Sequence, residues 1–157
     1  MAQDARGQIA CTAVGVDQFA TGLNGTRSPY GSPRNAYNLA YVSGGSSSGS
    51  ASATAAGLVA FALGTDTAGS GRVPAGLNNI VGFKPSKGLL STRGVVPAAR
   101  TVDCVSVFAR TVPQAWAAVQ AAAGFDPSDA CSRELQMQAT PLPAGVRVGI
   151  PAKPEFF

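Results

Sequence analysis

The 157-residue chain contains no histidine, and this absence disfavours several kinds of active site at once. A Ser-His-Asp triad within the chain is excluded, because the base of such a triad is an imidazole. Only three cysteines are present, Cys11, Cys104 and Cys131, and no two of them form a CxxC pair. A zinc site or a Cys-His nucleophile is therefore disfavoured, and we expect reduced thiols in or near a core. Any serine nucleophile in this chain needs a different base.

Long apolar runs and concentrated charge are also missing. No apolar stretch approaches the roughly 20 residues that span a bilayer, and the N-terminus lacks a charged region leading into a hydrophobic one. Only 13% of the residues are charged, and the 12 Lys and Arg residues behind the net charge of +4 are dispersed along the chain. Dispersed charge provides no footprint for nucleic acid or for a membrane surface. We therefore expect a cytoplasmic protein that binds neither.

The chain does contain enough apolar surface to form a core. With 45% hydrophobic residues in 157 positions, the composition is that of one globular domain. Residues 1–43 are polar and rich in turn signals, whereas later segments have periodic apolar positions. The patterns predict helices at Ser50–Ala56, around Ser70–Asn78 and after an N-cap at Thr111, and strands at Leu58–Leu63 and Val146–Ile150.

Two glycine- and serine-rich segments lie among these elements, Gly44–Ser50 and Gly64–Arg72. A flexible linker explains only the first, because the second ends an apolar run and carries Asp66, Ser70 and Arg72 on its turn. A strand that ends in a glycine turn before a helix directs several N–H groups into one space, which suits an oxyanion or a phosphate. Neither GxxxxGKS/T nor a well-placed GxGxxG accompanies the turn, which disfavours a nucleotide site.

Residues 44–47 read Gly-Gly-Ser-Ser, and residues 64–70 read Gly-Thr-Asp-Thr-Ala-Gly-Ser. Together they resemble the core of the amidase signature family, whose members hydrolyse amides with a Ser, cis-Ser, Lys triad. By this match Ser46 is the cis-serine, and Ser70, 24 positions later, is the nucleophile. The resemblance also implies an oxyanion hole and a structural support: the backbone amides of Thr67, Ala68, Gly69 and Ser70, and the side chains of Asp66 and Arg72.

The same resemblance implies a fold and a division of the chain. It begins near Asp17, so residues 17–157 are expected to form a partial amidase domain after an unmatched N-terminal segment of residues 1–16. The implied fold class is α/β, as part of an α/β/α sandwich with a central mixed sheet. The resemblance implies no cofactor and no metal.

The lysine of the family's triad has no counterpart in this chain. A serine hydroxyl is a poor nucleophile until a base takes its proton, and in the family a buried neutral lysine does this through the cis-serine. None of the 45 residues before Ser46 is a lysine, and the chain's lysines are Lys84, Lys87 and Lys153. Lys84 stands in Gly-Phe-Lys-Pro, a segment with a structural role in the family. We therefore expect an internal slice of a larger amidase domain that is inactive alone.

Within the family, three segments resemble the allophanate hydrolases: Asp17–Arg27, Leu89–Pro97 and Asp103–Ala109. This resemblance implies a small-molecule amide substrate, allophanate, hydrolysed to ammonia and carbon dioxide in urea degradation, and a biotin-dependent urea carboxylase as functional partner. Two alternatives stay open: another amidase, including a glutamyl-tRNA amidotransferase A-type subunit, and a catalytically inactive amidase fragment. The oligomeric state also stays open, with a homo-oligomer among the outcomes.

Overall fold

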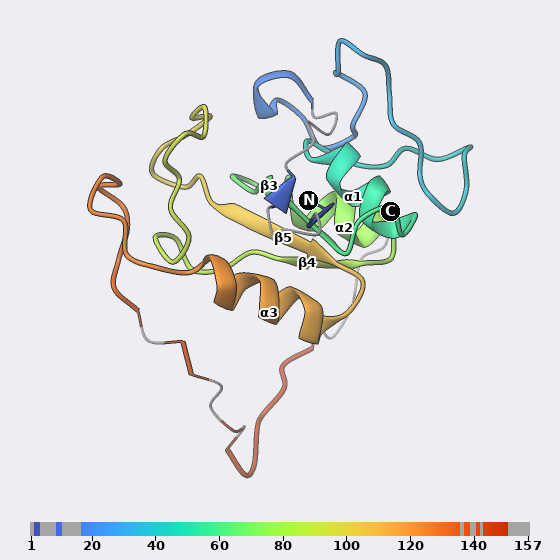
Figure 1. Cartoon of the computed structure of the whole chain (residues 1–157). Coiled ribbons are helices and arrows are strands. Elements are labelled where there is room, and N and C mark those ends of the chain that lie inside the picture. Colours follow the sequence, from blue (N-terminus) through green and yellow to red (C-terminus); the bar gives the residue numbers. More distant parts are fainter. Residues whose placement is uncertain are drawn as a thin grey trace.

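The computed structural model describes residues 2–3, 9–10, 17–135, 137–138, 141 and 143–150. None of the helices in this part of the chain has the length and apolar character to cross a membrane. Figure 1 shows how the helices and strands are arranged. In chain order they are β1 (Ala2–Gln3), β2 (Ile9–Ala10), a 3-10 turn (Gln18–Ala20), α1 (Ser48–Ala55), β3 (Phe61–Thr65), α2 (Arg72–Leu77), β4 (Val81–Phe83), β5 (Val105–Ala109) and α3 (Val112–Ala122).

Strand β5 is the centre of a three-stranded sheet. It pairs antiparallel with β3 on one side and with β4 on the other, so that Val107 lies opposite both Leu63 and Phe83. The short strands β1 and β2 pair antiparallel with each other. The described residues therefore contribute antiparallel pairs to the sheet. The strand patterns of the sequence predicted neither β4 nor β5.

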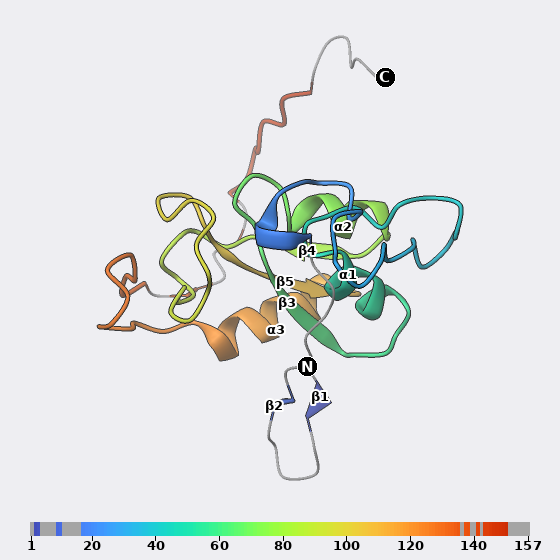
Figure 2. The same cartoon turned by 90° about the horizontal axis from the view of Figure 1, so that it is seen from above.

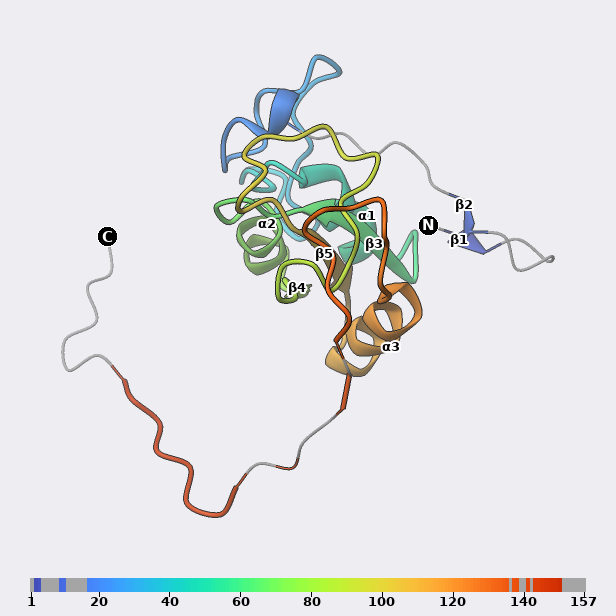
Figure 3. The same cartoon turned by 90° about the vertical axis from the view of Figure 1, so that its left-hand side faces the viewer.

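Helices cover both faces of this sheet, which gives the three layers of an α/β/α sandwich (Figures 1 and 3). Successive side chains of a strand point to opposite faces, so Val107 and Ala109 of β5 pack toward α3 while Phe108 packs toward α1 and α2. The α/β fold class predicted from the sequence is confirmed. The other buried members of the two clusters are Leu90, Ala115, Ala118 and Val119 on the α3 side, and Ala51, Ala62 and Ala75 on the opposite side.

Two of the predicted helices show why their sequences form them. Helix α3 begins after Thr111, whose hydroxyl accepts the N–H of Gln114 at 3.4 Å. Pro113 fits this first turn, because its missing N–H would have no partner there in any case. Helix α1 is built of small residues, so it lies close to β3, and Ser50 Oγ donates to the Leu63 carbonyl at 2.8 Å. The predicted helices are thus confirmed, with ends shifted by one or two residues.

The two predicted strands differ from the structure. Leu58 is 76% exposed, and β3 begins only at Phe61, because Gly57 follows the C-cap of α1 with a left-handed φ of +73° and a turn comes next. The prediction of a strand at Val146–Ile150 is wrong. This segment is exposed, runs away from the sheet (Figure 2) and pairs with no strand that the structure describes. An apolar pattern without a neighbouring strand does not form a sheet.

Replacing Phe108 with alanine should lower the free energy of unfolding by about 3–5 kcal/mol, because it removes a fully buried ring and leaves a cavity. Urea denaturation followed by circular dichroism measures this change. Phe125, which is 59% exposed, provides a matched control. Phe125→Ala should change the free energy by less than about 0.5 kcal/mol. Equal losses in the two variants would contradict the central position of Phe108.

Candidate active site

Ser46 lies just before α1, at the end of the turn formed by Gly44 and Gly45. The peptide bond between Gly45 and Ser46 is cis, the conformation that the resemblance implies for this serine. Only 1% of Ser46 is exposed, and its hydroxyl has no hydrogen-bond partner among the described residues. A buried hydroxyl without a partner is rare in folded proteins and calls for an explanation. Ser46 also lines a cavity, so a ligand held there would meet it.

The turn before Ser46 is held by the buried carboxylate of Asp17. This carboxylate accepts the N–H groups of Gly25 at 3.0 Å and Arg27 at 2.6 Å. The N–H of Asp17 itself donates to the Ser46 carbonyl at 2.9 Å. Gly45 passes so close that a Cβ there would lie 2.5 Å from Asp17 Oδ2, which requires glycine. Asp17 therefore fixes the backbone of Ser46. Asp17 belongs to a segment that resembles the allophanate hydrolases, but that resemblance did not predict this contact.

Ser47 joins the Ser46 segment to Ser70. Its N–H donates to the Ser70 carbonyl at 3.3 Å, and its hydroxyl lies 3.2 Å from both the N–H nitrogen and the carbonyl oxygen of Thr65, at the end of β3. Gly64 makes this approach possible, since a Cβ there would lie 2.5 Å from Ser47 Oγ. The structure thus brings the two serine motifs together. Only the position of Ser47 within Gly-Gly-Ser-Ser hinted at this contact.

The turn after β3 is built around the buried carboxylate of Asp66. Arg72 donates to it from its backbone N–H at 3.0 Å, from Nε at 2.9 Å and from Nη2 at 3.1 Å. Lys84 Nζ donates to the same carboxylate at 3.2 Å and to the Thr67 carbonyl at 3.3 Å. Burial alone would raise the pKa of Asp66, but the hydrogen bonds from Arg72 and Lys84 outweigh burial and hold this pKa well below its ordinary value. These contacts brace the turn.

The structure leaves three of the four amides expected in the oxyanion hole open. The N–H of Gly69 donates to Asp66 Oδ1 at 2.8 Å, so this amide is used inside the turn and does not fit the expected role. The N–H groups of Thr67, Ala68 and Ser70 have no acceptor in the described part of the chain. Ser70 is 3% exposed. These three amides are the donors that a developing negative charge beside Ser70 could use.

The turn rests directly on the central strand at Gly71. A Cβ at this position would lie 2.9 Å from both Cβ and Oγ of Ser106 and 3.0 Å from Cβ of Asp66. Ser106 is fully buried, and its hydroxyl, like that of Ser46, has no partner among the described residues. No side chain fits at position 71 without moving Ser106.

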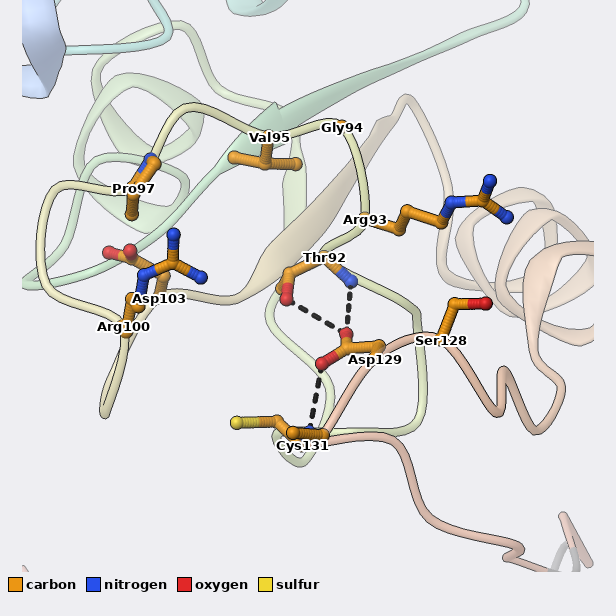
Figure 4. Close-up of a pocket in the computed structure, with 11 residues that line it drawn as sticks. Thr92, Arg93, Gly94, Val95, Pro97, Arg100, Asp103, Ser128, Asp129 and Cys131 are labelled. Atoms are coloured by element: carbon orange, nitrogen blue, oxygen red, sulfur yellow. Dashed lines mark hydrogen bonds between the residues drawn. The ribbon is translucent and has the colours of Figure 1, made fainter.

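Two cavities meet at residues 95–97. The cavity with Ser46 has a volume of about 330 Å³, and the other, shown in Figure 4, has about 430 Å³. Figure 4 shows Asp129 of the larger cavity accepting hydrogen bonds from Thr92 and Cys131. Ser46 lines only the smaller of these two cavities, and Ser70 lines neither, so the smaller one is the candidate site because of Ser46. Its lining consists of Asp17, Phe19, Ala20, Ser46, Gly64, Thr65, Val95, Val96 and Pro97.

The thiols of the two described cysteines do not line the cavity with Ser46. Cys104 is free and buried, and burial raises the pKa of its thiol, which donates to the Pro85 carbonyl at 3.3 Å. Cys131 is free and half-buried, and Cys11 lies outside the described residues. Within the described ranges, no group of three or more acidic or cysteine side chains is placed to hold a metal ion.

A sequence model of the amidase family matches residues 4–156, so the match includes most of residues 1–16. The urea amidolyase of Lachancea kluyveri is 50% identical over an alignment of 155 residues that covers 96% of this chain and 8% of that protein. The chain therefore spans less than a tenth of the length of this relative.

Two solved structures are also similar. The selenomethionine-substituted allophanate hydrolase of Kluyveromyces lactis is 58% identical, with a TM-score of 0.75 over 76% of this chain and 20% of that one. The A-type subunit of the glutamyl-tRNA(Gln) amidotransferase of Thermotoga maritima is 39% identical, with a TM-score of 0.79 over 82% of this chain and 28% of that one. In both cases the chain covers less than a third of the solved protein.

The free energy of unfolding should fall as the pH is lowered below the ordinary carboxyl pKa of 3.8. The folded-state pKa of Asp66 is lowered, so the unfolded chain binds more protons in acid, and the stability present above pH 3.8 is lost as the pH falls through the folded value. Asp103 and Asp129 act in the same direction, the latter with a pKa of about 2.

Urea denaturation at several pH values between 7 and 2.5 measures this dependence. Asp66→Asn should lower stability at pH 7 and flatten the acid limb of the curve. Glu134→Gln, which removes an exposed carboxyl, serves as the control. An acid limb equally steep in wild type and Asp66→Asn would contradict the role given to Asp66.

Proposed function

The chain belongs to the amidase family, and we propose that it carries the serine pair of an enzyme that hydrolyses allophanate to ammonia and carbon dioxide. The observation that carries this proposal is the junction of the two serine motifs. A buried hydroxyl without a partner, that of Ser46, faces a cavity, and Ser47 ties its backbone to Ser70. The choice of allophanate is supported by the similarity to urea amidolyase and to allophanate hydrolase.

In the proposed reaction Ser70 is the nucleophile. Its Oγ forms a bond to the amide carbon while its proton passes to Ser46. The carbonyl oxygen becomes an oxyanion that the open N–H groups of Thr67, Ala68 and Ser70 stabilise, and losing one such donor typically costs about 100- to 1,000-fold in rate. The bond between the carbonyl carbon and the terminal amide nitrogen then breaks, and ammonia leaves with the proton that Ser46 returns. Water breaks the ester bond to Ser70 and releases a carboxylated carbamate, which decomposes to two molecules of carbon dioxide and the second ammonia.

This relay needs a base behind Ser46, and the described lysines do not supply one. Lys84 is engaged by the Asp66 turn, and Lys87 donates to two backbone carbonyls of a later loop. Both therefore hold loops in place, and Lys153 lies outside the described residues. We propose that the base is the family's lysine, contributed by an amidase segment that precedes residues 17–157 in the complete domain.

The proposal extends to the setting in which the enzyme works. The similarity to urea amidolyase supports a functional partnership with a urea carboxylase, which would supply allophanate. The free thiols of Cys104 and Cys131 fit a reducing compartment, which supports a cytoplasmic location.

A second candidate is a glutamyl-tRNA amidotransferase A-type subunit. The Thermotoga maritima protein superposes on a larger share of this chain than the allophanate hydrolase does, which favours this alternative. The two candidates differ in substrate, so we expect kcat/KM for allophanate to exceed kcat/KM for glutamine in any active form of the protein. The opposite order would reject allophanate hydrolysis in favour of the second candidate.

The 157-residue chain alone should release no ammonia from allophanate at ordinary enzyme rates of about 1–1,000 per second, because neither described lysine is free to receive the proton of Ser46. Joining the chain to the preceding segment of the Kluyveromyces lactis allophanate hydrolase should restore turnover. A steady-state ammonia assay measures both proteins. Turnover by the chain alone that is abolished by Ser70→Ala would show that no further base is needed.

Three variants of the fusion protein test the assigned roles. Ser70→Ala should lower kcat by about 10⁴- to 10⁶-fold, as expected for a lost nucleophile. Ser46→Ala should lower it by about 10²- to 10⁴-fold, because proton transfer is impaired. Cys104→Ala changes a buried thiol outside the relay and should leave the chemical step largely intact. Activity that survives Ser70→Ala but disappears in Cys104→Ala would make the nucleophile assignment wrong.

A further inference from the structure

One short segment forms part of the wall of both cavities near the site. Val95 and Pro97 line the cavity that holds Ser46, and they also line the larger cavity of Figure 4. Val96, between them, lines the cavity with Ser46. The placement of this segment therefore determines the shape of the space in front of Ser46.

Asp103 anchors this wall from behind. Its carboxylate accepts the N–H of Ala98 at 3.0 Å and the N–H of Ala99 at 2.9 and 3.0 Å, and these two residues directly follow Pro97. The N–H of Asp103 returns to the Ala99 carbonyl at 2.8 Å, so residues 98–103 close into a compact loop. Asp103 is only 4% exposed, although its side chain is a carboxylate.

The same carboxylate reaches the turn that carries the open amides. Thr67 Oγ1 donates to Asp103 Oδ1 at 2.6 Å, although the two residues are 36 positions apart. The Thr67 carbonyl is held separately by Lys84 Nζ at 3.3 Å. This carbonyl and the N–H of Ala68 belong to one planar trans peptide and point in opposite directions. Holding Thr67 therefore also directs the N–H of Ala68.

The charge of Asp103 makes this arrangement cooperative. Burial raises the pKa of Asp103, but the hydrogen bonds from Thr67, Ala99 and Ala98 outweigh it, so the pKa lies below its ordinary value and the carboxylate stays ionised at neutral pH. A buried anion that loses one of its donors is left undersatisfied, and the remaining contacts must rearrange around it. Losing the hydrogen bond from Thr67 therefore changes the hydrogen bonds that Ala98 and Ala99 make to Asp103. A displacement of Ala98 and Ala99 likewise changes the position of Thr67.

We propose that Asp103 is a positioning residue that couples the wall at residues 95–97 to the turn at residues 67–70. A substrate that presses on the wall then also sets the direction of the amides that receive the oxyanion. This catalytic consequence rests on the proposed function, whereas the coupling itself is a property of the fold and is tested without turnover.

Hydrogen exchange of the 157-residue chain, resolved by residue, tests the coupling. Thr67→Val removes the hydroxyl donor while keeping the side-chain shape, and it should speed exchange at Ala98 and Ala99 by about tenfold or more, the effect of losing a hydrogen bond to a charged group. Asp103→Asn should speed exchange at Gly69, whose N–H donates within the turn. Thr67→Ser keeps the hydroxyl and should restore the wild-type rates.

Thr92→Val is the matched control, because Thr92 Oγ1 also donates to a carboxylate, that of Asp129, at 2.8 Å. It should speed exchange at Cys131, whose N–H donates to Asp129, and leave Gly69 unchanged. Unchanged exchange at Ala98 and Ala99 in Thr67→Val would overturn the proposal. Wild-type amides at these two residues that exchange as fast as in an unfolded chain would overturn it as well.

The fusion of this chain to the preceding amidase segment tests the catalytic consequence. Thr67→Val and Asp103→Asn should each lower kcat for allophanate by about 10- to 100-fold with a smaller change in KM, because misdirected amides weaken the transition state more than the bound substrate. Thr67→Ser should recover most of the loss. An effect confined to KM would reject this consequence. If the fusion protein hydrolyses no amide at all, the proposed function fails, while the exchange rates still decide the coupling.

Discussion

The buried carboxylate of Asp66 is the constraint on which the rest of the site depends. It is the common acceptor for the N–H of Gly69, for the backbone and guanidinium of Arg72 and for the ammonium of Lys84. A buried carboxylate is costly unless its oxygens accept hydrogen bonds, so each of these donors helps to stabilise the turn. Ser70 lies between Gly69 and Arg72 and is therefore held from both sides. The shared acceptor therefore helps to set the path of the turn that carries the open amides.

Local patterns were sufficient to predict the helices and the serine motifs. The capping signal at Thr111 specifies the start of α3 within a few residues, because an N-cap hydroxyl and a proline in the first turn act on neighbouring backbone groups only. The spacing of Ser46 and Ser70 carried the resemblance, and the structure joins their segments through Ser47. These features depend on residues that are close in the chain or that belong to one recurring motif.

Contacts between distant segments could not be predicted in the same way. Nothing in the residue pattern indicates that Asp103 accepts a hydrogen bond from Thr67, or that Asp17 supports the backbone of Ser46. Strand β5 was missed because helices cover both of its faces, so polar and apolar residues do not alternate along it. The segment Val146–Ile150 was wrongly predicted to be a strand. An apolar pattern can indicate one strand, but it does not show whether a second strand is available to pair with it.

The close approach of Gly71 to Ser106 links two positions that are 35 residues apart. Because the volume between them is shared, a larger residue at position 71 requires Ser106 to shrink or move, and it also requires space against Asp66, whose Cβ would lie 3.0 Å from the added Cβ. Natural variation at the two sites should therefore be correlated, with glycine at position 106 accompanying any larger residue at position 71. In directed evolution the two positions should therefore be randomised together, because enlarging residue 71 alone produces a clash with Ser106.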